Sequence, residues 1–173
     1  MIGMEGKTLH SERLTYRLLE EQDKAALADL LRDETVTGPA GFRPAQTPEE
    51  FDRFFRELTQ NRTAVALLLG QTLLGYFHVN PYRLRDPKYQ DQACVSVGYV
   101  VGKAYQNRGY GTEMLKTLTA YLKGRFAYCF ADCFEGNLPS QRVILRCGYQ
   151  YYERYTLYVS ALGEDRTCES YVY

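Results

Sequence analysis

The pattern of apolar and polar positions predicts that strands and helices alternate along this chain. Apolar side chains recur at helical spacing over residues 114–122, and Gly124 follows them as a typical residue just past a helix end. A continuous apolar run at 93–101 comes before that helix and predicts a buried strand. The loop between the two carries Gly102, Gly109 and Gly111.

Six further strands and three further helices follow from the same pattern. Thr47-Pro48-Glu49-Glu50 is a capping box with proline at the first helical position, which is a strong start signal for a helix. Segments 33–46 and 82–92 are polar or rich in glycine and proline, so we interpret both as loops. The succession of elements indicates an α/β fold. The other strands are predicted at 14–19, 63–69, 72–79, 127–134, 149–160 and 167–173, and the other helices at 22–32, from 48 onward and at 139–147.

The composition favours one globular domain over residues 1–173. Lys plus Arg equals Asp plus Glu at 21 each, which argues against a nucleic-acid or anionic-membrane partner. We find no apolar run of membrane-spanning length and no signal-peptide pattern, so we expect a cytoplasmic location. The five cysteines form no Cys-x-x-Cys pair and lie in apolar patterns, so we expect buried free thiols and no metal site.

A strand, a glycine-bearing loop and a helix start together predict an anion site. The first amides of a helix have no internal acceptor, and glycine lets a phosphate approach the backbone closely. A dinucleotide fingerprint would need glycine at Met114, and a P-loop lysine motif is missing. The loop instead reads Gln106-x-x-Gly109-x-Gly111.

This motif resembles that of the GNAT superfamily of acyl-CoA-dependent N-acyltransferases. Further motifs of the family occur in order as Ser11-Glu12-Arg13-Leu14, Gly98-Tyr99, Asn137-x-x-Ser140 and Cys147-Gly148-Tyr149. The Ser11-Glu12-Arg13-Leu14 motif resembles that of the branch that contains the ribosomal-protein N-acetyltransferases. The resemblance implies a mixed, mostly antiparallel sheet of about seven strands flanked by about four helices, splayed between the fourth and fifth strands. It also implies acetyl-CoA as the acyl donor.

The resemblance assigns a set of residues to acetyl-CoA. The strand backbone would pair with the pantetheine arm and supply an oxyanion donor, the loop and helix start would hold the pyrophosphate, and the Asn-x-x-Ser motif would lie near the pantetheine and the sulfur. These residues are Tyr99, Val100, Val101, Gln106, Asn107, Arg108, Gly109, Tyr110, Gly111, Thr112, Asn137 and Ser140.

The groups that would move protons depart from the family pattern. Ile144 stands where many members carry a tyrosine that protonates the departing thiolate, so Ser140 or a water must donate. Ser96 stands where members of this branch often carry a basic glutamate. His78 and Tyr76, which share one strand face, are candidates to accept the amine proton, and a water chain is the alternative.

These observations favour an acetyl-CoA-dependent N-acetyltransferase that acts on a primary amine by direct attack in a ternary complex. A non-catalytic acyl-CoA-binding or sensor protein of the same fold is the alternative, and a subunit of a larger complex is a third. The acceptor, a small molecule or a protein N-terminus, would be selected by loops 33–46 and 82–92 and by the tyrosine-rich strand 149–160. We expect a monomer or a homodimer.

Overall fold

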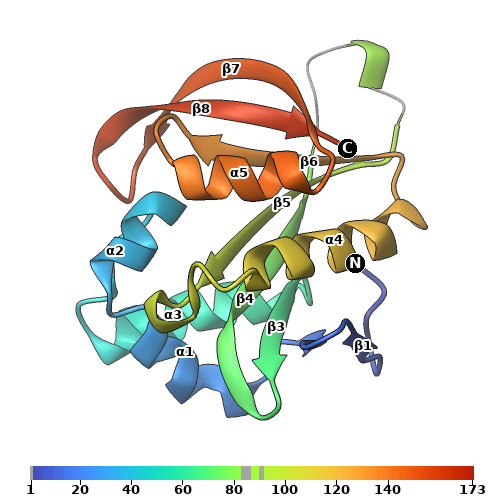
Figure 1. The fold of residues 1–173 in the computed structure, drawn as a ribbon. Helices are drawn as coiled ribbons and strands as arrows, with labels where there is room; N and C mark the ends of the chain where they lie inside the picture. Colours follow the sequence, from blue (N-terminus) through green and yellow to red (C-terminus); the bar gives the residue numbers. More distant parts are fainter. Residues whose placement is uncertain (1, 83–86, 90–91) are drawn as a thin grey trace.

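A single eight-stranded sheet organises the part of the chain described by the computed structural model, residues 2–82, 87–89 and 92–173. The strands follow the order β1-β2-β3-β4-β5-β6-β8-β7 across the sheet (Figure 1). All neighbours are antiparallel except β5 and β6, which run parallel. The strands are β1 Leu9–His10, β2 Thr15–Leu18, β3 Ala64–Leu69, β4 Thr72–Pro81, β5 Cys94–Val101, β6 Tyr128–Phe134, β7 Gln150–Val159 and β8 Glu164–Val172.

Five α-helices of the described residues cover the two faces of this sheet. Figure 1 shows α4 and α5 crossing in front of the strands. Leu27 of α1 and Phe55 of α3 belong to a separate apolar cluster on the opposite face, together with Tyr76 and Val100. The helices are α1 Lys24–Leu30, α2 Glu34–Thr37, α3 Pro48–Gln60, α4 Tyr110–Lys123 and α5 Leu138–Arg146.

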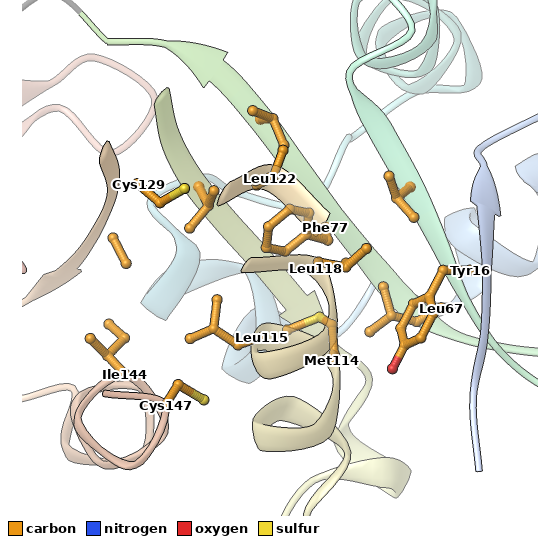
Figure 2. Packing of buried hydrophobic residues seen from close by; sticks show 14 of the residues in the cluster. Tyr16, Leu67, Phe77, Met114, Leu115, Leu118, Leu122, Cys129, Ile144 and Cys147 are labelled. Atoms are coloured by element: carbon orange, nitrogen blue, oxygen red, sulfur yellow. The ribbon is translucent and has the colours of Figure 1, made fainter. Parts of the chain in front are cut away.

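The main core lies between α4, α5 and the sheet. Met114, Leu115, Leu118 and Leu122 of α4 are at most 2% exposed. Figure 2 shows this stripe facing Phe77 of the sheet, with Ile144 and Cys147 of α5 beside it. Full burial of each large apolar side chain contributes about 1.5–3 kcal/mol to folding, so this packing fixes α4 against the sheet.

Most sequence-predicted elements are present, with boundaries shifted by a few residues. The Thr47 side chain accepts a hydrogen bond from the amide of Glu50, so the predicted cap of α3 is confirmed. The five cysteines are free and buried, as expected. Residues 83–86 and 90–91 of the predicted loop 82–92 lie outside the described residues.

Three local features differ from the prediction. The segment 33–46 is not all loop. Asp33 caps the one-turn helix α2, and the Val36 side chain is buried in the apolar cluster beneath α1 and α3. β1 is a two-residue pairing with β2, too short to leave a pattern in the sequence. The last hairpin turns at residues 160–163, so β8 begins at Glu164 although its first residues are polar.

No helix among the described residues is long and apolar enough to span a membrane.

Candidate functional site

An opening in the sheet between β5 and β6 defines the candidate site. The two parallel strands pair only from Cys94↔Tyr128 to Val97↔Ala131. Beyond this point β5 continues to Val101 beside β4, whereas β6 turns away and pairs with β8 up to Phe134. The predicted splay between the fourth and fifth predicted strands is therefore confirmed, and it begins at Gly98 and Asp132.

The backbone of β5 directs hydrogen-bonding groups into this opening. The Gly102 amide donates to the Leu74 carbonyl at 2.8 Å, which makes Val101↔Gly75 a pair without mutual hydrogen bonds. By alternation, Val100 exchanges hydrogen bonds with β4, and the N–H and C=O of Tyr99 and Val101 face the other way. The Gln106 side chain already donates to the Val101 carbonyl at 2.9 Å. The Tyr99 N–H therefore points away from β4 and toward the opening.

The loop before α4 is the segment that the sequence predicts as a pyrophosphate cradle. Gly109 is the N-cap of α4 at φ 82°, and no side chain caps the helix, so its first amides are left for a ligand. Asn107 also has a left-handed backbone at φ 60°. A Cβ on Gly111 would point at Val143 of α5 at 3.6 Å, into the space between the two helices. The residues thus fit a pyrophosphate at the start of α4.

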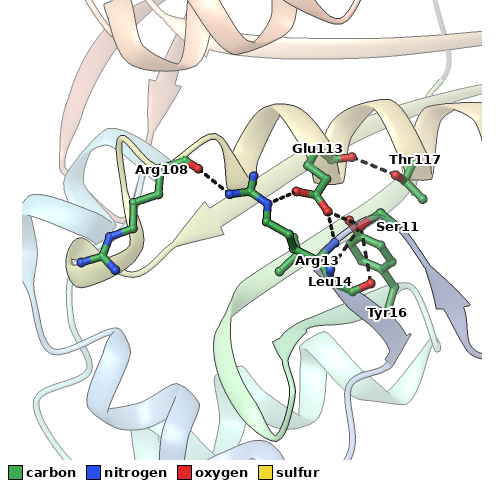
Figure 3. A network of polar contacts seen from close by, with 7 residues as sticks. All are labelled: Ser11, Arg13, Leu14, Tyr16, Arg108, Glu113 and Thr117. Carbon is green, nitrogen blue, oxygen red and sulfur yellow. Dashed lines mark hydrogen bonds and ion pairs between the residues drawn. The ribbon is translucent and has the colours of Figure 1, made fainter.

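A polar network ties the N-terminal segment to this cradle (Figure 3). Arg13 donates through Nε to Glu113 Oε2 at 2.7 Å and through Nη1 to the Arg108 carbonyl at 3.0 Å. Its guanidinium also lies 4.5 Å from the centre of the Tyr110 ring. Ser11 Oγ donates to Glu113 Oε1 at 2.6 Å and is hydrogen-bonded to the buried Tyr16 hydroxyl. The network therefore holds the loop and the first turn of α4 in place.

Glu113→Gln is expected to lower the free energy of unfolding by about 2 kcal/mol at pH 7, because it weakens charge-assisted hydrogen bonds. Burial raises the pKa of Glu113, but bonds from Ser11 and Arg13 outweigh it, so the pKa is lowered overall. A lowered carboxyl pKa gives stability above the ordinary value of about 4.3 that is lost as pH falls below it. Urea unfolding should show a smaller difference in free energy of unfolding between the wild-type protein and Glu113→Gln at pH 3 than at pH 7.

Glu164→Gln is the matched control, because its 2.7 Å ion pair with Arg166 is exposed and contributes about 0.2–1 kcal/mol at most. Equal losses for the two variants at pH 7 would contradict a special role for the Glu113 network.

Two hydroxyl groups meet across the opening on the α5 side. Tyr99 of β5 and Ser140 of α5 are hydrogen-bonded at 3.0 Å, and the Ser140 amide donates to the Asn137 side chain at 3.3 Å. Burial raises the pKa of Tyr99 above its ordinary value, with a smaller opposing effect from Ser140, so this phenol stays protonated near neutral pH. The phenol therefore carries a proton at neutral pH, whereas the Ile144 side chain, buried in the core, has no ionisable proton.

His78 and Tyr76 lie on the opposite face of the sheet from this pair. Tyr76 is buried in the cluster with α1 and α3, and its ring centre is 5.9 Å from that of His78. The imidazole lies over Gly98, where an added Cβ would come within 2.6 Å of the ring. Burial lowers the pKa of His78, so the ring is neutral at pH 7. His78 Nδ1 is buried without a hydrogen-bond partner.

Asp132 of β6 lies on the face of the sheet that carries Tyr76 and His78, which we call the second face. Its side chain shares a face with that of Phe130, two residues earlier, and Phe130 pairs with Ser96, which shares a face with Gly98 and His78. Tyr155 of β7 donates to Asp132 Oδ2 at 3.2 Å, whereas Oδ1 is buried and unpartnered. Burial raises the pKa of Asp132, and the nearby hydroxyls of Ser170 and Tyr155 lower it less. The Ser170 hydroxyl is close enough for this effect without reaching hydrogen-bond geometry.

The structure brings together the predicted cradle residues and the Tyr99, Asn137 and Ser140 group, and it places Tyr76 and His78 across the sheet from Ser140. The sequence predicts a role for the Tyr99 backbone but not for its side chain, and it does not single out Asp132. A carboxylate inside the apolar run Tyr128–Phe134 was the available signal, because acidic residues are seldom buried without a reason.

The comparisons with known proteins agree with this geometry. The family model described as "Acetyltransferase (GNAT) domain" matches residues 13–150, which is more than half of the chain. The chain therefore belongs to the GNAT family of acetyltransferases, and acetyl-CoA is the acyl donor of this family. Among curated protein sequences, none matches this chain.

Solved structures share the fold at low sequence identity. An acetyltransferase of the GNAT family from Bacillus anthracis superposes with a TM-score of 0.80 at 20% identity, covering 96% of this chain and 97% of that one. A ribosomal-protein-alanine N-acetyltransferase from Brucella melitensis gives a TM-score of 0.70 at 15% identity, covering 91% and 98%. At such identities the likeness shows the fold alone.

Proposed function

We propose that this acetyltransferase moves the acetyl group of acetyl-CoA to the nitrogen of a primary amine by direct attack in a ternary complex. The observation that carries the proposal is the Tyr99–Ser140 hydroxyl pair at 3.0 Å, beside backbone groups of β5 that face the splayed opening. Acetyl-CoA supplies an acetyl group activated as a thioester. The Tyr99 N–H and the Tyr99–Ser140 hydroxyl pair then lie together at the opening. They supply the hydrogen-bond donor and the proton donor that acyl transfer requires.

Each part of the chain has a distinct task in this proposal. The first amides of α4 and the loop 106–109 bind the pyrophosphate, and the Arg13–Glu113 network holds that loop in shape. The Tyr99 N–H stabilises negative charge on the thioester oxygen. The Tyr99–Ser140 pair gives a proton to the departing sulfur.

The acceptor amine would approach from the face that carries Tyr76 and His78. The segment between α2 and α3 borders this side of the opening, because an added Cβ on Gly41 would lie 3.0 Å from the Phe134 ring of β6. The Pro39 carbonyl accepts from the Asn137 side chain at 3.4 Å, and Arg43 donates to the Leu162 carbonyl at 3.0 Å. Both a small-molecule amine and a protein N-terminus remain in the proposal, since the similar Brucella melitensis protein is named for a ribosomal protein.

The proposal keeps a cytoplasmic location and a monomer or a homodimer as the working form. Light scattering coupled to size exclusion would decide between the two forms.

Initial-rate kinetics test the ternary complex. CoA release is measured with thiol reagent while acetyl-CoA and an amine are both varied, using spermidine and the peptide amides Ala-Arg-Tyr and Ser-Arg-Tyr as probes. Direct attack gives intersecting double-reciprocal lines, whereas an acetylated enzyme gives parallel lines. Tight acetyl-CoA binding without CoA release from any probe would instead support the non-catalytic binding protein.

A further inference from the structure

Three buried polar atoms without partners lie in one row across the second face of the sheet. They are His78 Nδ1, Asp132 Oδ1 and Ser170 Oγ, three of the five such atoms among the described residues. His78 pairs with Gly98, and Asp132 pairs with Ser170. Gly98 and Asp132 are each the next residue after the last β5–β6 pair. The row therefore crosses the sheet at the point where the opening starts.

The row also separates two apolar clusters on this face. One cluster contains Tyr76 and Val100 beneath α1 and α3, and the other contains Tyr89 and Phe130. Gly98 contributes no side chain at the middle of the row, and the His78 ring lies over it, within 2.6 Å of where a Cβ would be. Unsatisfied polar groups are unfavourable inside a protein unless water or a ligand completes their bonds. A polar ligand group at this position would complete them.

Asp132 is the acidic member of the row, and its carboxylate has no cationic partner among the ion pairs of the described residues. Tyr155 holds one carboxylate oxygen at 3.2 Å and leaves the other unbound. An ammonium group is the ligand that supplies both positive charge and hydrogen-bond donors to such an oxygen.

We propose that Asp132 binds the ammonium form of the acceptor and takes its first proton, so that the nitrogen can attack. The inference rests on the proposed N-acetyl transfer and adds its missing proton acceptor. The neutral nitrogen forms a bond to the thioester carbon as the carbon–sulfur bond breaks. The nitrogen gives up a second proton to solvent, which balances the proton that the Tyr99–Ser140 pair passes to the sulfur and regains from solvent. Asp132 then returns its own proton to solvent.

The surroundings of Asp132 suit this role. Three of its titratable neighbours are neutral near pH 7, because burial raises the pKa of Tyr82 and of Cys133 to about 12 and that of Cys168 to about 11. Burial also raises the pKa of Tyr155. His78, across the row, is neutral for the reason given above. The arriving ammonium is thus the positive charge that Asp132 meets, and the Glu153 carboxyl, which pairs with Ser170, is a second acidic group near the row. The groups that face Asp132 on this side of the sheet are Tyr82, Tyr155, Cys168, His78 and Glu153, the last of which pairs with Ser170.

The test compares Asp132→Asn with the wild-type protein and with Asp29→Asn, which makes the same chemical change at an exposed position on α1. Spermidine and Ala-Arg-Tyr amide are the probes. Asp132→Asn is expected to lose at least about 100-fold in kcat at pH 7.5 while its Kd for acetyl-CoA stays within about twofold. Its kcat/KM should rise about tenfold per pH unit up to the amine pKa, since only the free amine can then react. A merely structural role would not give this slope.

A second readout is independent of activity. A buried carboxyl with a raised pKa destabilises the folded state once pH exceeds its ordinary value of about 3.9. Asp132→Asn should therefore raise the melting temperature more at pH 7.5 than at pH 4. An unchanged or lowered melting temperature at pH 7.5 would contradict the uncompensated carboxylate.

Each kinetic outcome separates this inference from the function it rests on. Absence of CoA release by the wild-type protein would overturn the proposed N-acetyl transfer together with this role. Normal wild-type turnover with full activity in Asp132→Asn would overturn the role of Asp132 alone. The same pH-dependent loss in His78→Gln but not in Asp132→Asn would assign the proton to His78.

Discussion

Tyr99→Phe is expected to lower kcat by about 100-fold with little change in the Kd for acetyl-CoA. The variant removes the hydroxyl that is hydrogen-bonded to Ser140 at 3.0 Å and leaves the β5 backbone intact. A positioned proton donor typically contributes 10²–10⁴ in rate, and 100-fold corresponds to about 2.7 kcal/mol of barrier. Single-turnover CoA release, measured with acetyl-CoA prebound, would isolate this step from binding.

Tyr149→Phe is the matched control for this prediction. Its hydroxyl is also buried and hydrogen-bonded, to Thr119 at 2.8 Å, but it lies in the core between α4 and β7. It should lose about 1 kcal/mol of stability and keep its kcat. Ser140→Ala should reproduce part of the Tyr99→Phe loss, because the two hydroxyls act as a pair. Equal kcat values for Tyr99→Phe and Tyr149→Phe would show that the Tyr99 hydroxyl is not the proton donor.

Gly109→Ala is expected to weaken acetyl-CoA binding by at least tenfold. The left-handed backbone at φ 82° strains any side chain there, and the new Cβ would lie 3.2 Å from Arg13 Nη2. The loop must then shift, and the loss of one charge-assisted bond to a phosphate costs about 1.5–3 kcal/mol. Isothermal titration with acetyl-CoA measures the change directly.

Gly70→Ala separates backbone strain from ligand contact. Gly70 has a similar left-handed backbone at φ 60° in the β3–β4 turn, and an added Cβ there would meet nothing within 4 Å. Both variants should lose about 1–2 kcal/mol of stability. Only Gly109→Ala should lose affinity for acetyl-CoA. Matching affinities in the two variants would show that the cradle is not where the pyrophosphate binds.

The fold could be predicted from the sequence because its main signals are local. The α4 stripe, the Thr47 cap and the apolar runs each depend on spacing within one segment, and the motif Gln106-x-x-Gly109-x-Gly111 identifies the strand-to-helix loop. The helix α2 was missed since its four residues include valine and two threonines, which have low helix propensity, and Asp33 and burial of Val36 stabilise it.

The proton-handling groups could be predicted only in part. Ser140 belongs to a recognisable motif, but its partner Tyr99 is 41 residues away, and the hydrogen bond depends on how α5 packs over the opening. The row that joins His78, Gly98 and Asp132 depends on the register of three strands. A strand pattern shows that side chains alternate, but it does not show which residues of other strands lie opposite them.

The position of CoA in a crystal of the complex tests the central claim most directly. The account requires the pantetheine arm to lie between β5 and β6, hydrogen-bonded to the Tyr99 backbone, with the pyrophosphate on the amides before and at the start of α4. The sulfur should lie near the Tyr99–Ser140 pair, with Asp132 on the far side of the opening. Well-defined CoA bound at any other surface, with the β5–β6 opening filled only by solvent, would contradict the account.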